Sequence, residues 1–399
     1  MNILFLSLGN FDDIYKKGIY TDLLRKCIKE GHNVYIVAAR EKRTNKETEY
    51  SGENRTHILN VRVGNITKTN IIEKGISTLL IEKQFLSAIK RYYSGVRFDL
   101  VLYATPPITF EKVIEYIKNR DKARTYLMLK DIFPQNAVDL GMFSKKGLIY
   151  KYFRKKEKKL YSISDYIGCM SEANVDYVLE HNREIDPAKV EVCPNSVEVE
   201  ECNISDEDRL CIRLKYGIPI DKKIFVYGGN LGKPQGIDFL IKCLKSQSDN
   251  RDAYFLIIGS GTEYKRLENY YGSSGQKNLK IMSSLPKIDY ELLVKACDIG
   301  MIFLDRRFTI PNFPSRLLSY MQAKLPVLAV TDANTDVGKV ITQGGFGWWC
   351  QSGDIEAFNK VILNVMNSKL SDMGSNSYQY FLNNYTVDNA YKAIMEHFV

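Results

Sequence analysis

The sequence predicts an α/β protein with two doubly wound domains, each a mainly parallel sheet covered by helices on both faces. Short apolar runs alternate with longer amphipathic segments through most of the 399 residues, which is the first observation behind this prediction. The second is that the alternation lapses once, near Pro194, and then restarts. We therefore expect an N-terminal domain of residues 1–196 and a C-terminal domain of residues 197–374. A last helix, at about 375–399, is expected to pack back on the N-terminal domain.

The N-terminal half contains apolar runs typical of strands that are covered on both faces, because such strands are nearly continuous in Val, Ile and Leu. The expected strands are Asn2–Leu8, Asn33–Ala39, Phe98–Ala104, Thr125–Lys130, Tyr166–Met170 and Lys189–Cys193. Apolar residues at helical spacing predict helices over Gly18–Glu30, Ile71–Tyr93, Phe110–Asn119, Gly147–Tyr161 and Ala173–His181. The segment Arg40–Asn70 is polar and charged, so we expect an excursion outside the core with at most one short strand.

The C-terminal half repeats this pattern. Its expected strands are Ile224–Tyr227, Tyr254–Ile258, Leu279–Met282, Ile299–Leu304 and Val327–Val330. Its expected helices are Gly236–Lys245, Glu263–Tyr270, Asp289–Ala296, Pro314–Lys324, Thr335–Gln343 and Ile355–Met366, with Asn384–Phe398 as a terminal helix. Pro314 suits a first helical turn, where its missing N–H would have had no partner, and Pro326 stops the same helix.

Composition favours a cytosolic globular protein. Apolar residues make up 45% of the chain, and no apolar run is long enough to cross a bilayer. The first eight residues lack the basic start and cleavage site of a signal peptide and resemble a buried first strand. The eight cysteines are scattered, without a C-x-x-C pair or a nearby His, so we expect reduced thiols and no zinc site.

The net charge of +9 is concentrated in the first half of the chain. Residues 1–196 contain 33 Lys and Arg against 24 Asp and Glu, and Lys145–Tyr161 alone contains eight basic residues and one acid. Its apolar residues recur at roughly helical spacing, so this helix could lie on an anionic membrane surface. The alternative is an ordinary surface helix with a solvated basic face. We do not expect nucleic-acid binding, because no recognised motif accompanies the basic residues.

Glycine-rich turns follow several of the expected strands, where ligands bind in open α/β sheets. They are Ser7-Leu8-Gly9-Asn10 with Lys17-Gly18-Ile19, Tyr227–Gly236, and Ile258-Gly259-Ser260-Gly261. The segment Pro311–Ala329 adds the start of a helix, where the amides of Ser315, Arg316 and Leu317 and the Arg316 charge would hold an anion. An ordinary capped helix with a solvated Arg is the alternative at that position. Together these loops indicate a nucleotide diphosphate in a cleft between the two domains.

These features resemble glycosyltransferase family 4, whose members are retaining, metal-independent nucleotide-sugar transferases with the GT-B fold. The resemblance rests on the two α/β halves, the Gly-rich turns and Pro314–Met321 followed by Lys324–Val327. Ser171-Glu172-Ala173 and Pro194-Asn195-Ser196 occur in the usual order. Within the family, Gly229–Gly236 and Lys130–Gln135 are most similar to bacterial capsule and O-antigen transferases of the fucosamine or N-acetylhexosamine type.

The resemblance implies roles for particular residues. Asp131 would bind sugar hydroxyls or assist deprotonation of the acceptor, and its alternative role is a helix N-cap. Arg316 and Lys233 would be the catalytic cations that stabilise the departing diphosphate. The donor-binding residues would be Gly9, Gly18, Gly229, Asn230, Gln235, Gly259, Gly261, Met282, Pro314, Ser315, Leu317 and Ser319. No cofactor and no metal are expected.

The chain also departs from the family pattern. Asn230 and Gln235 stand where the family has an Arg and a Lys, and Pro311 and Ser319 stand where it has two Glu. We interpret this as a variant active site. The implied activity is transfer of an N-acetylated or deoxy hexosamine from a UDP-sugar to a lipid-linked saccharide, at the cytoplasmic face of the plasma membrane. The alternatives are a catalytically silent membrane- or partner-binding protein of the same fold and a nucleotide-sugar epimerase.

Overall fold

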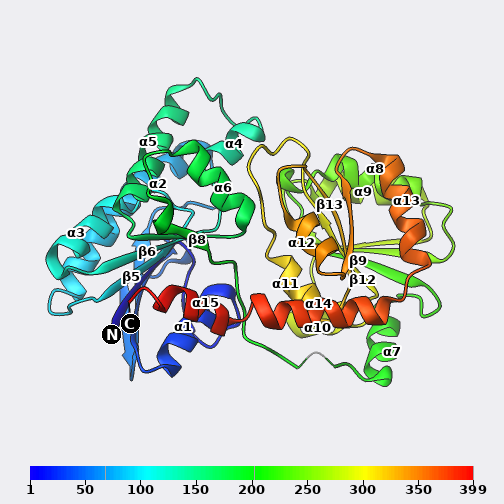
Figure 1. The fold of residues 1–399 in the computed structure, drawn as a ribbon, viewed down its shortest axis with the longest axis horizontal. Helices are drawn as coiled ribbons and strands as arrows, with labels where there is room; N and C mark the ends of the chain where they lie inside the picture. The colour runs from blue at the N-terminus through cyan, green and yellow to red at the C-terminus, as the bar shows by residue number, and fades with distance from the viewer. Residues whose placement is uncertain (68, 202, 399) are drawn as a thin grey trace. The chain divides into compact units, whose positions relative to one another are not determined.

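The computed structural model describes residues 1–67, 69–201 and 203–398, which form two compact units (Figure 1). Unit 1 comprises Met1–Glu198 and Val387–Val399, and unit 2 comprises Val199–Thr386. The chain thus returns to unit 1 at Val387, whereas the sequence placed that return at about residue 375. The single terminal helix expected there is two helices, one in each unit.

Unit 1 is built on an eight-stranded sheet with the order β3-β4-β2-β1-β5-β6-β7-β8. Its strands are β1 Asn2–Ser7, β2 Asn33–Glu41, β3 Glu49–Glu53, β4 Thr56–Val63, β5 Leu100–Ala104, β6 Arg124–Leu129, β7 Tyr166–Cys169 and β8 Val190–Val192. All neighbours pair in parallel except β3 and β4, which form an antiparallel hairpin. The six strands expected in this half are confirmed.

The expectation that Arg40–Asn70 lies outside the core was wrong. β4 pairs with β2 along its whole length, from Val34↔Thr56 to Glu41↔Val63, and its apolar side chains are buried. Polar residues interrupt its apolar pattern, but they have partners inside the unit. Asn60, for example, is buried and donates to the carbonyl oxygen of Phe11 at 2.9 Å. A buried polar residue with a hydrogen-bond partner looks like a surface residue in the sequence alone.

The helices of unit 1 cover both faces of the sheet (Figure 1). They are α1 Ile19–Lys29, α2 Ile71–Tyr92, α3 Glu111–Asp121, α4 Gln135–Asp139, α5 Leu148–Ile163, α6 Glu172–His181 and α15 Val387–Met395. The five predicted helices are confirmed, and the short α4 was not expected. The returning helix α15 packs on α1, where Lys26 pairs with Asp388 at 2.5 Å and His32 Nε2 lies 2.8 Å from the Tyr391 hydroxyl oxygen.

Unit 2 is built on a six-stranded parallel sheet with the order β11-β10-β9-β12-β13-β14. Its strands are β9 Lys223–Asn230, β10 Ala253–Ser260, β11 Leu279–Met282, β12 Ile299–Phe303, β13 Val327–Thr331 and β14 Gly347–Gln351. The first five were predicted. The edge strand β14 was missed, although Trp348-Trp349-Cys350 is a short apolar run. Only one of its five residues, Cys350, is buried.

The helices of unit 2 are α7 Asp206–Lys215, α8 Ile237–Ser246, α9 Tyr264–Ser274, α10 Lys287–Lys295, α11 Arg316–Gln322, α12 Val337–Gln343, α13 Ile355–Met366 and α14 Leu370–Asn384. α7 was not predicted, because an acidic stretch hides its start. The sequence nevertheless contains a signal for its start, because Ser205 is a preferred N-cap residue. In the structure the Ser205 side chain accepts from the Asp208 N–H at 3.0 Å. α11 ends at Gln322. Two residues later Lys324 has a left-handed φ of 54°, and the Leu325 N–H donates back to the Tyr320 carbonyl at 2.9 Å.

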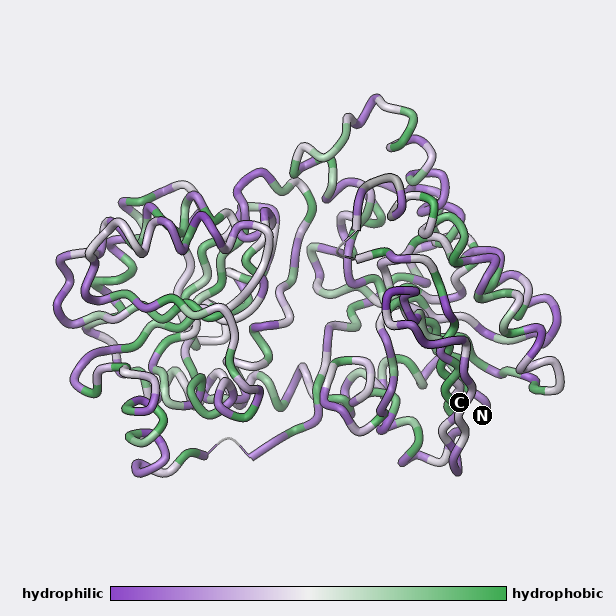
Figure 2. The backbone as a smooth tube through the Cα atoms, turned by 180° about the vertical axis from the view of Figure 1, so that it is seen from behind, coloured by the Kyte–Doolittle hydropathy of each residue, from purple (hydrophilic) through white to green (hydrophobic). Residues whose placement is uncertain are grey.

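Each unit has its own hydrophobic core around the central strands, which are coloured as hydrophobic in Figure 2. The seven cysteines in the described residues are free thiols, and Cys202 lies outside them. Burial raises the pKa of the Cys27, Cys169 and Cys350 thiols to about 12. Within the described part of the chain, no helix combines the length and the apolar character needed to span a bilayer.

Candidate functional site

The order of strands in unit 2 reverses at β9, which is where an open parallel sheet binds ligands. The chain continues from β9 to β10 on one side, and later adds β12 on the other. β9 and β10 stay paired up to Asn230↔Ser260. β9 and β12 pair only at Phe225↔Ile299 and Val226↔Gly300 and then diverge. The divergence leaves the last residues of β9 open on the β12 side.

Tyr320 of α11 fills the opening between β9 and β12. Its hydroxyl oxygen accepts from the Gly228 N–H at 3.1 Å. The carbonyl oxygens of Val226 and Met301, at 3.2 and 3.1 Å, are alternative acceptors for its proton. The side chain is fully buried, and its ring lies where a Cβ on Gly300 would clash. The sequence did not single out Tyr320, because its role depends on a glycine in another strand. The Tyr320 side chain thus fixes α11 to the end of β9.

Tyr320→Phe is expected to lower the free energy of unfolding by about 1–3 kcal/mol, because it leaves buried backbone groups of β9 and β12 without their partner. Denaturant unfolding of the full chain measures this change. Tyr271→Phe is the matched control, since Tyr271 is a partly exposed tyrosine on α9. Equal unfolding midpoints for the two variants would contradict the role assigned to the Tyr320 hydroxyl.

The turns after β9 and β10 lie directly beside each other. Gly229 and Gly259 are partners in register, and a Cβ on Gly259 would clash with the carbonyl oxygen of Gly229. A Cβ on Gly261 would likewise clash with the carbonyl of Leu231. Gly229 also has a φ of +131°, which disfavours any other residue. These turns therefore need glycine for the close approach of two backbones.

The turn that follows β9 is braced by its own side chains. Asn230 Nδ2 donates to Gln235 Oε1 at 3.2 Å, and the Gly232 N–H donates to the same oxygen at 3.0 Å. The Tyr227 hydroxyl donates to the Asn230 carbonyl at 2.6 Å. Asn230 and Gln235, which were predicted to bind the nucleotide-sugar donor, thus shape the turn. Lys233 is exposed in this turn and makes no ion pair within the described residues.

Arg316 begins α11 and lies against the end of β9. Its guanidinium carbon is 4.2 Å from the centre of the Tyr227 ring, in a cation–π contact. A Cβ on Gly229 would be 3.2 Å from Arg316 Nη2, so the guanidinium covers this glycine. Arg316 Nη1 is buried and has no hydrogen-bond partner among the residues that the structure describes. A buried N–H without a partner costs free energy, so this nitrogen is ready to bind an anion beside the glycine turn.

The start of α11 differs from the prediction. A helix over Pro314–Lys324 with free amides at Ser315, Arg316 and Leu317 was expected, whereas α11 begins at Arg316. The Leu317 N–H donates to the Pro314 carbonyl at 3.1 Å, because a tight turn precedes the helix. The Leu317 amide is therefore not free, and its side chain is buried in the core. Ser315 is exposed, and its side chain makes no capping hydrogen bond.

Two further predicted donor ligands lie at the edges of this region. Ser319 is exposed on α11, one turn after Arg316. Met282 is partly buried at the end of β11, where it pairs in register with Ile258. Because β10 separates β11 from β9, Met282 and Gly229 belong to strands that are not neighbours.

Unit 1 has its own reversal of strand order at β1, which lies between β2 and β5. Gly9 and Gly18, predicted to border the donor, follow this strand and are exposed. The Gly9 N–H donates to Ser7 Oγ at 3.0 Å, and the Gly18 N–H donates to Asp22 Oδ1 at 2.9 Å. A phosphate bound by either amide would have to displace these side chains.

Asp131 follows β6 at the same edge of the unit 1 sheet and is held by two neighbours. Asn136 Nδ2 donates to both of its carboxylate oxygens at 2.8 Å. Thr105, which follows β5, donates through Oγ1 to the Asp131 carbonyl at 3.0 Å and accepts from the Lys130 N–H at 3.1 Å. Thr105 therefore joins the ends of β5 and β6 and fixes the backbone of Asp131.

Burial raises the pKa of the Asp131 carboxyl to about 6, although hydrogen bonds from Asn136 and the Ile132 N–H act in the opposite direction. The alternative role of Asp131 as a helix N-cap is not supported, because Pro134 occupies that position before α4. A carboxyl group with this pKa at a ligand-binding sheet edge is suited to exchange a proton near neutral pH.

Lys130 is a neighbour of Asp131 that the sequence did not single out. Its ammonium nitrogen donates to the Cys193 carbonyl at 3.1 Å, which ties the end of β6 to the segment after β8. Burial lowers the pKa of Lys130. The one sequence signal for Lys130 is its position directly before Asp131. Neither periodicity nor spacing distinguishes a lysine held inside the fold from a solvated one.

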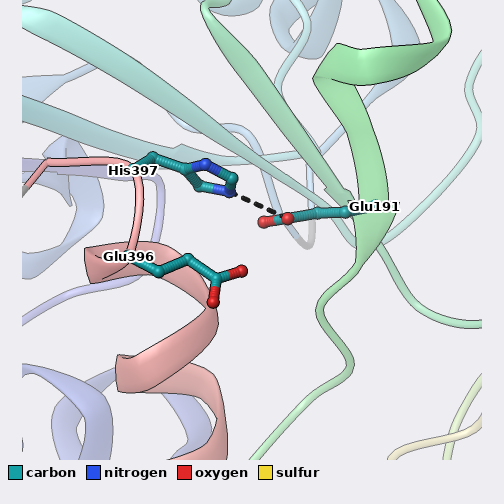
Figure 3. Close-up of side chains that lie close together, drawn as sticks. All are labelled: Glu191, Glu396 and His397. Carbon is teal, nitrogen blue, oxygen red and sulfur yellow. Dashed lines mark hydrogen bonds and ion pairs between the residues drawn. The ribbon is translucent and has the colours of Figure 1, made fainter.

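Among the described residues, one group of side chains in unit 1 has the spacing of metal ligands. Glu191, Glu396 and His397 each place one ligand atom within 4.8 Å of the others (Figure 3). His397 Nε2 lies 2.8 Å from Glu191 Oε2, and the Tyr126 hydroxyl donates to Glu191 Oε1 at 2.6 Å. The His397 ring also stacks on Tyr166. Because protein donors already occupy both Glu191 oxygens, we interpret the group as an anchor for the C-terminal segment.

Two doubly wound units, each with a ligand-binding edge where its strand order reverses, define the GT-B class of fold. Two family models match the chain. The model described as Glycosyltransferase Family 4 matches residues 20–201, and the model described as Glycosyl transferases group 1 matches residues 208–380. The two matched ranges are contained almost entirely in unit 1 and unit 2, respectively, so the chain is a glycosyltransferase built from a family 4 domain and a group 1 domain.

Similar proteins include WbjE of Pseudomonas aeruginosa, named as a probable glycosyltransferase. It is 25% identical over 311 residues, which are 77% of this chain and 75% of WbjE. WcaI of Escherichia coli K12, assigned to colanic acid biosynthesis as a glycosyl transferase, is 23% identical over 61% of this chain and 60% of its own length. Among solved structures, HepE of Anabaena in complex with UDP and glucose has a TM-score of 0.71 at 13% identity. That match covers 100% of this chain and 99% of HepE.

Proposed function

We propose that this glycosyltransferase moves an N-acetylated or deoxy hexosamine from a UDP-sugar to a lipid-linked saccharide, with retention of configuration, in bacterial surface polysaccharide synthesis. The observation that carries the proposal is Arg316, whose unpartnered Nη1 lies beside the glycine turn of β9. The solved neighbour HepE binds UDP and glucose, which supports a UDP-linked donor. The assignment of WcaI to colanic acid biosynthesis supports a polysaccharide product.

The proposed chemistry depends on stabilising the leaving group. The bond between the anomeric carbon and the diphosphate oxygen breaks, and the acceptor oxygen bonds to that carbon on the same face. The acceptor proton passes to the departing phosphate. Arg316 and Lys233 balance the negative charge that develops, and such preorganised stabilisation is usually the largest catalytic contribution. Because these cations act on the diphosphate, the proposed reaction needs no metal ion.

Asp131 has a separate proposed role in unit 1. A carboxyl group with a pKa of about 6 can accept a hydrogen bond from a sugar hydroxyl, or assist the transfer of the acceptor proton to the departing phosphate. Asn136 holds both of its oxygens, so the carboxylate is oriented before the substrate binds. We assign Asp131 to the acceptor or to the donor hydroxyls, as its place at the sheet edge permits both.

The proposed acceptor is carried by a lipid, so the enzyme would work at the cytoplasmic face of the plasma membrane. Support comes from the charge of the N-terminal half, where basic residues outnumber acidic ones by 33 to 24 in residues 1–196. The basic segment 145–161, which forms most of α5, is the proposed contact with anionic lipid.

A panel of nucleotide sugars, read by thermal shift in the presence of a chelator, tests the donor assignment. A ligand at 100 times its Kd stabilises the folded protein by about 2.7 kcal/mol, so UDP-N-acetylhexosamines and UDP should raise Tm without added metal. Equal Tm values with and without every UDP compound would overturn the UDP assignment. Shifts that require Mg²⁺ would overturn metal independence.

The alternative of a catalytically silent protein of the same fold rests on Pro311, Ser319, Asn230 and Gln235, which replace charged residues of the family pattern. Release of UDP from the donor, in the presence of lipid-linked acceptor or by slow hydrolysis, separates the two. Turnover that is lost in Arg316→Ala supports the transferase. Donor binding without any turnover would support the silent protein.

A further inference from the structure

The structure divides the basic charge of α5 into two groups. Among the described residues, four basic residues in the second half of the segment 145–161 form ion pairs within unit 1, whereas Lys155 does not. These pairs are Arg154–Glu157, Lys156–Glu111, Lys158–Glu184 and Lys159–Glu115. They link α5 to α3 and to the loop after α6, so their charges are already neutralised by the fold. The whole segment 145–161 is therefore not an open basic surface.

The other four basic residues remain available. Lys145, Lys146, Lys151 and Lys155 are exposed, and none forms an ion pair in the part of the chain that the structure describes. No acidic residue occurs between Asp139 and Glu157 in the sequence. These four lysines form a patch without neutralising charge around the first two turns of α5.

Large apolar side chains are exposed within the same patch. Leu148 is 83% exposed, Met142 64%, Ile149 56% and Tyr152 42%. The loop before α5 and the first turns of the helix project from unit 1 (Figure 1), and hydrophobic and hydrophilic residues follow each other closely there (Figure 2). Single exposed apolar residues are common, but four within eleven positions among unpaired lysines form a contiguous amphipathic surface.

α2 presents a second apolar stripe. Ile76, Leu79 and Leu80 are 57%, 57% and 47% exposed, and the exposed Lys83 continues the i, i+3, i+4, i+7 spacing. α3 packs against both α2 and α5. Glu82 of α2 accepts from the Lys112 N–H at 2.6 Å, next to the residue that pairs with Lys156 of α5. Since both helices precede parallel strands, they begin at the same edge of the sheet.

We propose that the first two turns of α5 with the preceding loop, together with the stripe of α2, form one docking surface for an anionic phospholipid bilayer. The four free lysines contact the headgroups, and Met142, Leu148, Ile149, Leu79 and Leu80 enter the interface. A second copy of the chain fits less well, because a symmetric contact would place the same unpaired lysines against each other. This inference rests on the proposed function and deepens it, since it names the residues that bring the enzyme to its lipid-linked acceptor.

Flotation of the full chain with vesicles tests the proposal. The vesicles contain equal parts of phosphatidylglycerol and phosphatidylcholine, or phosphatidylcholine alone. The wild type should bind the first and not the second, and binding should weaken as salt increases. The combined change of Lys145, Lys146, Lys151 and Lys155 to Gln should lower binding by more than about 100-fold, since each lysine contributes about fivefold. Leu148→Ser with Ile149→Ser should lower it by about tenfold.

Three further variants test the contribution of α2 and control for apolar exposure and for nonspecific charge. Leu79→Ser with Leu80→Ser should also weaken binding several-fold. Leu210→Ser with Leu214→Ser is the apolar control, because these residues are exposed on α7 of unit 2. Change of the exposed Lys242, Lys245, Lys265 and Lys360 of unit 2 to Gln is the charge control. Both controls should bind vesicles as the wild type does.

Several outcomes would overturn the proposal. They are wild-type binding that does not depend on phosphatidylglycerol, equal loss in the charge control, or concentration-dependent dimers that disappear in the Leu148/Ile149 variant. Wild-type binding by the Leu79/Leu80 variant would remove α2 from the surface. UDP-induced thermal shifts of the same variants separate this inference from the proposed function. A variant that no longer binds vesicles but keeps its UDP-induced rise in Tm supports the docking surface. A wild type whose Tm does not change with UDP contradicts only the donor assignment.

Discussion

Arg316→Ala is expected to lower kcat/KM by about 100- to 1,000-fold, the usual effect of removing one preorganised donor to a developing negative charge. The guanidinium is fixed by its contact with the Tyr227 ring and by Gly229 beneath it, so it is oriented before the diphosphate departs. Steady-state turnover with the donor identified by the panel measures the effect. Loss of the ring contact itself costs only about 1 kcal/mol, so the variant should still fold.

Two companion variants sharpen this result. Arg316→Lys keeps the charge but loses the planar fork, so partial rescue of about tenfold relative to alanine is expected. Lys233→Ala should have a smaller effect than Arg316→Ala, because Lys233 is exposed and solvent screens its charge. Wild-type turnover in Arg316→Ala would show that this guanidinium does not contact the leaving group.

Asp131→Asn is expected to stabilise the protein while it lowers activity. The folded-state pKa of about 6 exceeds the ordinary value of 3.8, so the native state binds the proton more tightly than the unfolded state does. Stability therefore falls as pH rises between these two values, and the ionised carboxylate costs on the order of 1–3 kcal/mol at neutral pH. Asn removes this cost and still accepts from Asn136. Denaturant unfolding at pH 7 should show the gain.

The activity of Asp131→Asn should fall by about 100-fold or more if the carboxylate takes part in the reaction. The wild-type rate should decline as pH falls through about 6, because Asp131 becomes protonated, and the residual rate of the variant should lack this dependence. Wild-type turnover in Asp131→Asn, with an unchanged pH profile, would show that the residue only supports the sheet edge. The change in stability and the change in activity thus distinguish a structural role from a chemical one.

The sequence predicted the elements that bury continuous apolar runs. β1, β5, β6, β9, β10 and β13 are such strands, and glycine marks the turns at the ends of β1, β9 and β10. It did not predict β4, because polar residues such as Asn60 interrupt the pattern, and the Asn60 side-chain amide donates to a distant partner, the Phe11 carbonyl. The edge strand β14 was missed for a different reason, since its apolar run, Trp348-Trp349-Cys350, is too short for periodicity to identify a strand.

The candidate site was predictable in its composition and not in its contacts. Arg316 and the glycine turns stood out because ligands bind at the strand ends of open α/β sheets, where glycine lets the backbone approach a phosphate. The role of Tyr320 depends on Gly228 and Gly300 of two other strands, which no local pattern reveals. The hydrogen bond from the Leu317 N–H to the Pro314 carbonyl could not be predicted either, because one tight turn decides whether that N–H is free.

The split of charge in α5 illustrates the same limit. Eight basic residues in 145–161 predict one basic face, but four of them form ion pairs, three with α3 or the loop after α6 and one within α5. The acidic partners, such as Glu111 and Glu184, lie far away in the sequence. Only the folded unit therefore separates the lysines that hold α5 in place from those that face solvent.

The central claim is that the edge of unit 2 at β9 and α11 binds a nucleotide diphosphate through Arg316. Calorimetric titration of the full chain with UDP and with UMP, in the presence of a chelator, tests it most directly. We expect UDP to bind more tightly than UMP by at least about tenfold, or ~1.4 kcal/mol, and Arg316→Ala to abolish this difference. Equal affinity for UDP and UMP in the wild type, or an unchanged preference in Arg316→Ala, would contradict it.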